Sequence, residues 1–184
     1  VHTEIMLPPH APPSFSDRST LWNSVELYEK AGNAQLAREI DAALPIELSR
    51  EEQIRLVREY CSSQFVSKGM CVDFAIHDTD SGNPHCHIML TMRPLDERGA
   101  WAAKSKKEYD LDENGERIRL PNGRYKTHKV DLTGWNDKGN ALLWRKAWAD
   151  ISNSYLERAG STERIDHRSN AERGIDEIPT VHMG

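Results

Sequence analysis

Two histidines, His85 and His87, stand one residue apart at the start of the apolar segment PHCHIML, residues 84–90. In a β-strand, side chains at i and i+2 point to the same face about 6.6 Å apart, so the two imidazoles would lie side by side. His77 ends the alternating segment MCVDFAIH, residues 70–77, on its polar face. If the two segments pair as an antiparallel hairpin, cross-strand neighbours lie roughly 4.5 to 5.5 Å apart, and His77 reaches the same point in space.

Three neutral imidazoles that converge on one point make a site for a divalent metal ion, with coordination positions left open for substrate or water. The alternative that these histidines have no function stays open, because an HxH pair can arise by chance in a chain with eight histidines. The three cysteines form no CxxC pair, which disfavours a closed structural zinc site and favours an open catalytic one. Three imidazoles accept Mn²⁺, Zn²⁺, Co²⁺ or Ni²⁺, and Mg²⁺ when phosphate completes the coordination shell, so the ligands alone do not identify the ion.

The charge of the chain is segregated along the sequence. A net charge of −5 and a pI of about 5.9 argue against a nucleic-acid partner when taken alone. Residues 117–129 nevertheless contain no acidic side chain, and Tyr125 lies within them. Cations mixed with aromatic faces are typical of sites that hold single-stranded nucleic acid, although a solvated loop is the alternative. The candidate contacts in this region are Lys104, Lys106, Lys107, Arg117, Arg119, Arg124, Lys126 and Lys129.

Length and cysteine usage indicate one soluble domain in a reducing, cytoplasmic compartment. A chain of 184 residues can bury a sizeable core without disulfides. No apolar run approaches the ~18 residues of a membrane span, so no membrane association is expected.

The strands and helices expected around the histidines together indicate an α+β fold. Alternating apolar residues predict strands at 2–7 and 38–44, beside the hairpin that carries the histidines. A short closing strand is expected at residues 163–169.

Three helices are expected to pack on this antiparallel sheet. One starts near residue 17, the second follows a capping box formed by Ser49 and Glu52 and runs to about Lys68, and the third spans residues 138–158. Residues 96–135 are polar and rich in turn signals, so they are expected to form a basic loop excursion from the core.

The motif from His77-Asp78 through PHCHIMLTMRPL, ending at Leu95, resembles the metal-binding motif of MobA/MobL-type conjugative relaxases. These enzymes belong to the HUH (His-hydrophobic-His) endonuclease superfamily. Further segments resemble the family in the same order and cover most of the chain. They are ALPIELS, KSKKEYDLD, LTGWNDKGNALLWRKAWAD and RIDHRSNAERGIDEIPTVH.

The resemblance implies a sheet of about five antiparallel strands with helices packed on one face and the histidine pair on a central strand. It implies an enzyme that nicks one DNA strand at a plasmid transfer origin: a tyrosine attacks the phosphate, and the metal polarises a phosphate oxygen. By matching position, His77, His85 and His87 are the metal ligands. Cys86 points toward the core by parity and is expected to act as a small hydrophobe.

The resemblance also implies an acidic side chain beside a ligand histidine or the nucleophile. Glu39 matches best, and a solvated edge glutamate is the alternative. Glu4 and Asp41 share its face parity and are weaker candidates.

The family places its nucleophilic tyrosine near the N-terminus, in a segment that would precede Val1. The chain is therefore expected to be a single relaxase domain, 1–184, that is incomplete at its N-terminus, and no tyrosine is assigned the role. Tyr28 and Tyr155 are expected in the core, and Tyr60 in packing. On this hypothesis the 184 residues bind metal and DNA without forming a covalent adduct.

Partners implied by the resemblance are single-stranded DNA at a transfer origin, accessory mobilization proteins and a coupling protein, with the domain acting as a monomer in the bacterial cytoplasm. Arg168 could add a DNA contact, and His167 is left undecided. Alternative functions are a rolling-circle replication initiator, a non-catalytic module that binds metal and single-stranded DNA, and a three-histidine metalloenzyme for a small molecule, which would need a closed pocket.

Overall fold

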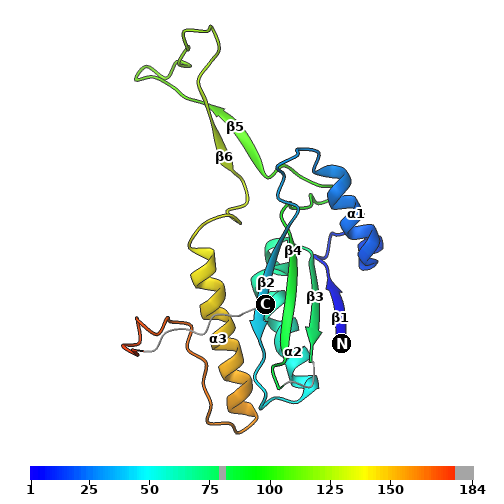
Figure 1. Ribbon diagram of the computed structural model, residues 1–184. Coiled ribbons are helices and arrows are strands. Elements are labelled where there is room, and N and C mark those ends of the chain that lie inside the picture. The colour runs from blue at the N-terminus through cyan, green and yellow to red at the C-terminus, as the bar shows by residue number, and fades with distance from the viewer. Residues whose placement is uncertain (79–81, 177–184) are drawn as a thin grey trace.

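The computed structural model describes residues 1–78 and 82–176, and its centre is a four-stranded antiparallel sheet (Figure 1). The strand order is β1-β3-β4-β2, which puts β4 in the interior of the sheet. The bounds are His2–Met6 for β1, Ala37–Ala43 for β2, Val72–His77 for β3 and His85–Thr91 for β4. The predicted α+β class, these four strands and the histidine hairpin are confirmed.

One face of the sheet is buried under two helices, α2 (Arg50–Gln64) and α3 (Asn140–Arg158). Phe74 and Ile76 of β3, with Cys86 and Ile88 of β4, are completely buried in this core. Because side chains alternate along a strand, the residues between them project from the opposite face, as the sequence pattern predicts.

Local sequence signals define the ends of α2. Ser49 and Glu52 form the predicted capping box, with the Ser49 backbone N–H donating to the Glu52 carboxylate at 2.9 Å. The α-helix ends at Gln64, and the predicted remainder is a 3₁₀ turn, Val66–Lys68. Gly69 then takes φ of 89°, a left-handed conformation that glycine adopts without steric cost.

The helix α1 (Arg18–Tyr28) closes one end of the opposite face, following a short 3₁₀ turn at Pro13–Ser16. Its anchor is Asp73, a buried carboxylate that accepts hydrogen bonds from the Arg18 guanidinium at 2.7 Å and from Trp22 Nε1 at 2.9 Å. A buried charge is tolerated only when it is paired and hydrogen-bonded, so this contact fixes α1 on the sheet. The face therefore stays uncovered by α1 at its other end, where β3 reaches His77.

The region predicted as a loop, residues 96–135, contains a two-stranded antiparallel ribbon instead. Its strands are β5 (Ser105–Tyr109) and β6 (Thr127–Asp131), and it extends away from the main sheet (Figure 1). Further pairing continues toward its tip at Leu111↔Arg117 and Arg119↔Tyr125. The ribbon packs neither face into the core, so its sequence lacks the apolar alternation that marks a half-buried strand.

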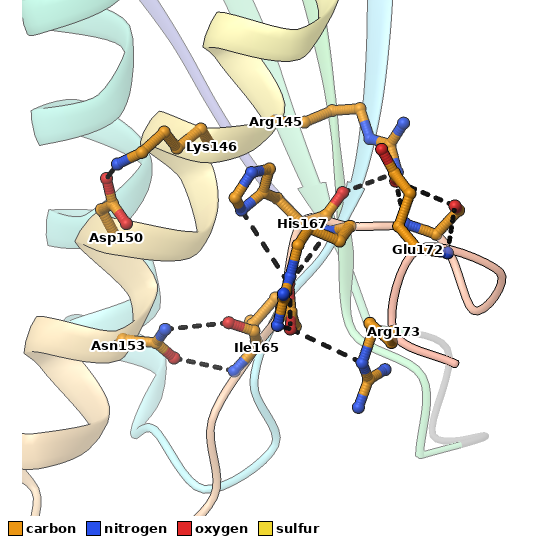
Figure 2. A network of polar contacts seen from close by, with 11 residues as sticks. Arg145, Lys146, Asp150, Asn153, Ile165, His167, Glu172 and Arg173 are labelled. Carbon is orange, nitrogen blue, oxygen red and sulfur yellow. Dashed lines mark hydrogen bonds and ion pairs between the residues drawn. The ribbon is translucent and has the colours of Figure 1, made fainter. Parts of the chain in front are cut away.

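The strand predicted at residues 163–169 is also wrong. The Asn153 side chain on α3 donates to the Ile165 carbonyl at 2.9 Å and accepts from the Ile165 N–H at 2.7 Å (Figure 2). Both backbone groups of Ile165 are thus used by a side chain rather than by a neighbouring strand. Among the described residues, none of the helices combines the length and apolar character needed to cross a membrane.

Candidate metal centre

The structure brings the three predicted histidines together on the uncovered face of the sheet. The distance between ring centroids is 5.6 Å from His77 to His85, and 5.1 Å from His87 to each of the others. Three imidazole nitrogens bound about 2.1 Å from one ion would place the ring centres about 5 Å apart. The spacing of the rings therefore fits a shared divalent cation, and all three side chains are partly exposed.

The strand register accounts for this convergence. His77 pairs directly with His85, and Ala75 pairs with His87. The small Ala75 side chain leaves the space in front of His87 to the imidazoles. His85 is further oriented by Asn83, whose carbonyl lies 2.9 Å from Nδ1, so that Nε2 is the nitrogen left for an ion.

A second strand supplies carboxylates behind His87. Asp41 is paired with His87 across the β2–β4 register, and its Oδ1 lies 2.5 Å from His87 Nδ1. Glu39 Oε1 is more distant, at 3.4 Å. Nδ1 is shielded from solvent and has no hydrogen-bond partner among the described residues, so the short Asp41 contact is not aligned with the N–H axis. Asp41, the weaker candidate from sequence, is thus the nearer carboxylate.

A different donor set also includes His87. Ligand atoms of Glu39, Asp41 and His87 all lie within 4.8 Å of one another. In the described residues the three imidazole nitrogens are not gathered this closely, so the rings must turn about their side-chain bonds to meet one ion. The two carboxylates are largely exposed, with 61% and 64% of their side-chain surface accessible, and exposed acidic pairs are common without any metal.

Cys86, between the two histidines, is buried in the core beneath the sheet, as its parity predicts. Burial raises the pKa of its thiol to about 12. Since a thiol must lose its proton to bind a metal, Cys86 is not a ligand in this arrangement.

The five tyrosines lie on other parts of the molecule, and none has a ring contact with the three histidines. Tyr60 and Tyr155 are buried, as predicted, and burial raises the pKa of both phenols. The prediction that Tyr28 is a core residue is wrong. The residue is 47% exposed, because α1 ends here and leaves that side open, and the centre of its ring lies 4.7 Å from the Arg93 guanidinium.

Carboxylates neutralise several of the basic residues singled out from the sequence. Lys104 pairs with Glu29 at 2.8 Å, Lys106 with Glu108 at 2.6 Å, Lys126 with Asp110 at 3.1 Å and Arg168 with Asp166 at 2.7 Å. The other candidates have no salt-bridge partner within 4 Å in the described residues, and all of them lie on the ribbon. They are Lys107, Arg117, Arg119, Arg124 and Lys129.

Aromatic faces accompany these free cations. The Arg117 guanidinium lies 4.0 Å from the centre of the Tyr109 ring and 5.8 Å from that of Tyr125. Arg119 lies 6.0 Å from the Tyr125 ring. The ribbon thus presents the mixture of charge and aromatic surface that suits a single-stranded nucleic acid.

A family model described as the MobA/MobL family matches residues 1–184. The chain is 37% identical over 195 residues to a conjugal transfer protein TraA of Rhizobium radiobacter, covering 100% of this chain and 17% of that protein. It is 35% identical to a probable mobilization protein MobA of Bifidobacterium longum, covering 97% of this chain and 34% of that protein. The chain therefore spans a minor part of the length of these relatives.

A solved structure also resembles the chain. It is described as the molecular basis of vancomycin resistance transfer in Staphylococcus aureus, and it superposes with a TM-score of 0.75 at 33% sequence identity. The match covers 92% of this chain and 76% of that one.

Proposed function

The chain belongs to the MobA/MobL family, and on that premise we propose that it carries the DNA-nicking centre of a conjugative mobilization protein. The proposed reaction is a metal-dependent, site-specific and strand-specific cut at a plasmid transfer origin. The observation that carries the proposal is the convergence of three imidazoles, from His77, His85 and His87, on a partly exposed sheet face.

Of the two possible donor sets, we favour the three imidazoles. In this arrangement Asp41 faces Nδ1 of His87 and leaves Nε2 for the ion. A carboxylate behind a ligand histidine orients the ring and makes it a better donor. Asp41, with Glu39 beside it, is then a positioning residue rather than a ligand, and the role predicted for Glu39 remains a proposal shared with its neighbour.

A divalent cation held here, Mn²⁺ or Mg²⁺ in preference to Zn²⁺, Co²⁺ or Ni²⁺, would supply Lewis-acid polarisation of a phosphodiester oxygen. The protein's own part is to hold three neutral nitrogens on one rigid hairpin. Because β4 is an interior strand paired on both sides, the positions of His85 and His87 are fixed by backbone hydrogen bonds rather than by a loop.

The attacking group is proposed to be a tyrosine, by family membership. The five tyrosines of this chain are poor candidates, because two are buried and the others lie at the end of α1 or on the ribbon. We therefore propose that residues 1–184 alone bind metal and DNA and do not form the covalent adduct.

The ribbon is proposed to hold single-stranded DNA through its unpaired cations, Lys107, Arg117, Arg119, Arg124 and Lys129. Arg168 and the other paired cations contribute less, since each would have to leave a carboxylate first. The further partners would be accessory mobilization proteins and a coupling protein, and the domain would act as a monomer in the bacterial cytoplasm.

Asp41→Asn is expected to lower the affinity for Mn²⁺ by about 10- to 100-fold, because an amide holds the His87 ring less firmly than a carboxylate does. Isothermal titration calorimetry of the 184-residue chain measures the change. Asp150→Asn, at an exposed carboxylate paired with Lys146 on α3, is the matched control and should leave the affinity unchanged. Equal affinities for the two variants would contradict the positioning role of Asp41.

The full-length protein is expected to nick a single-stranded transfer-origin oligonucleotide in the presence of Mn²⁺, with chelation by EDTA abolishing the reaction. His85→Ala should lower the nicking rate by at least about 100-fold, since a metal ligand is lost. His10→Ala, at an exposed histidine in the loop between β1 and the 3₁₀ turn, is the control and should retain the rate.

Denaturing gels of the same reactions separate chemistry from binding. The full-length protein should form a covalent band with the oligonucleotide, and the 184-residue chain should bind it without forming one. A rate unaffected by His85→Ala, or a phosphotyrosine adduct on the 184-residue chain, would show the corresponding part of the proposal to be wrong.

Binding of single-stranded DNA by the 184-residue chain should weaken with salt. If the five unpaired ribbon cations meet phosphates, the slope of log K against log [salt] is about −3.5. The double variant Arg119→Ala, Arg124→Ala should reduce the slope to about −2.1. Arg168→Ala, whose guanidinium is held by Asp166, should leave the slope unchanged, and fluorescence anisotropy measures all three. A flat salt response would remove the ribbon from the DNA interface.

A further inference from the structure

The open face of the sheet carries a guanidinium close to the three histidines. Asp73, which binds Arg18, precedes Ala75 by two residues on β3, and Ala75 pairs with His87. Side chains at i and i+2 of a strand point to the same face about 6.6 Å apart, so Asp73 lies one strand repeat from the row that contains His87. The Arg18 side chain is 48% exposed. A cation is therefore accessible beside the proposed metal centre.

Asp73 occupies only one edge of the Arg18 guanidinium. Its Oδ2 accepts a hydrogen bond from Arg18 Nε at 2.7 Å, and its Oδ1 accepts one from Nη2 at 2.7 Å. Arginine has five N–H groups in a planar fork, so both groups of Nη1 and the second group of Nη2 remain. Among the described residues, Nη1 makes no hydrogen bond. One N–H from each Nη atom can bind two oxygens of the same phosphate.

Arg18 can bind a phosphate without leaving its carboxylate. Asp73 is only 6% exposed and also accepts a hydrogen bond from Trp22 Nε1 at 2.9 Å. A phosphate that approaches from the solvent therefore meets the guanidinium and not the carboxylate. The pair of Arg168 and Asp166 differs in this respect, because the Asp166 carboxylate is 26% exposed.

The surface between Arg18 and the histidines is small and uncharged. The row of side chains that crosses the sheet at His87 contains Ala75 of β3 and Thr3 of β1. In the other direction the same row reaches Asp41 of β2, a largely exposed carboxylate that repels phosphate. A DNA strand with one phosphate at the metal centre is thus attracted toward Arg18 and repelled from β2.

We propose that Arg18, positioned by Asp73, binds the phosphodiester of single-stranded DNA that neighbours the one at the metal centre. The inference rests on the proposed nicking function, which places the cleaved phosphodiester at the histidines. A second bound phosphate would prevent the strand from sliding across the metal centre and would hold the cleaved bond in one register. Asp73 would then orient a DNA-binding residue in addition to anchoring α1.

The variants must separate this contact from the structural role of the ion pair. Arg18→Gln alone would leave the Asp73 charge buried without its partner and could unfold α1. Arg18→Gln combined with Asp73→Asn removes both charges and keeps an oxygen that accepts from Trp22. Arg58→Gln is the control, since Arg58 on α2 is also 48% exposed and bonded to a carboxylate. Thermal melting should show that both variant proteins are folded.

Binding of modified DNA by the full-length protein tests the proposal. Nicking of an unmodified transfer-origin oligonucleotide with Mn²⁺ first identifies the cleaved phosphate. Neutral methylphosphonates then replace the phosphates one at a time, and fluorescence anisotropy in EDTA measures the affinity of each oligonucleotide. In the wild type and in Arg58→Gln, a replacement next to the cleaved phosphate should weaken binding by about 10-fold or more. In the double variant, that position alone should lose its effect.

The pattern of sensitive positions decides the result. A double variant with the same sensitive positions as the wild type would overturn the proposal. Equal weakening at every position would show that the pair acts only through the placement of α1, and would also overturn it. Failure of the wild type to nick, with one position still sensitive only when Arg18 is present, would refute the nicking function and leave the phosphate contact supported.

Discussion

The register between β3 and β4 is the constraint on which the candidate site depends. It places His77 opposite His85, and His87 two residues further on the same face. Because side chains alternate with a period of two residues, a slip of one residue would turn the imidazoles into the core. That slip is opposed by Phe74, Ile76 and other fully buried side chains packed under α2 and α3. Packing on the covered face of the sheet thus determines that the three histidines lie on the open face.

Two carboxylates on the open face of the sheet have different surroundings and different roles. At one end, the buried Asp73 is neutralised by Arg18 and holds α1 in place. At the other end, Asp41 lies against a histidine and is largely exposed, so it remains accessible. A carboxylate that is hydrogen-bonded and covered serves the fold, whereas one beside an imidazole at a solvent-facing edge can orient a ligand. The same face of the sheet therefore stabilises the fold at one end and carries the proposed site at the other.

The parts of the fold with one buried face were predictable from the sequence. Alternation in MCVDFAIH and in REIDAAL reports a core on one side, and the capping box at Ser49 reports the start of α2. The ribbon was missed because both its faces meet solvent, so its pairing depends on turns and on contacts such as Arg117 with Tyr109. Residues 163–169 were misassigned because a side chain, Asn153, competes for the backbone of Ile165.

The sequence could not show that Asp41 rather than Glu39 is the carboxylate nearer to His87, since alternation puts both on one face and only the register with β4 makes Asp41 the direct neighbour of His87.

The most direct test of the account is X-ray absorption spectroscopy of Mn²⁺ bound to the 184-residue chain. The account predicts three imidazole nitrogens around the ion, with one lost in His77→Ala. A shell dominated by carboxylate oxygens with a single imidazole, unchanged by His77→Ala, would contradict it.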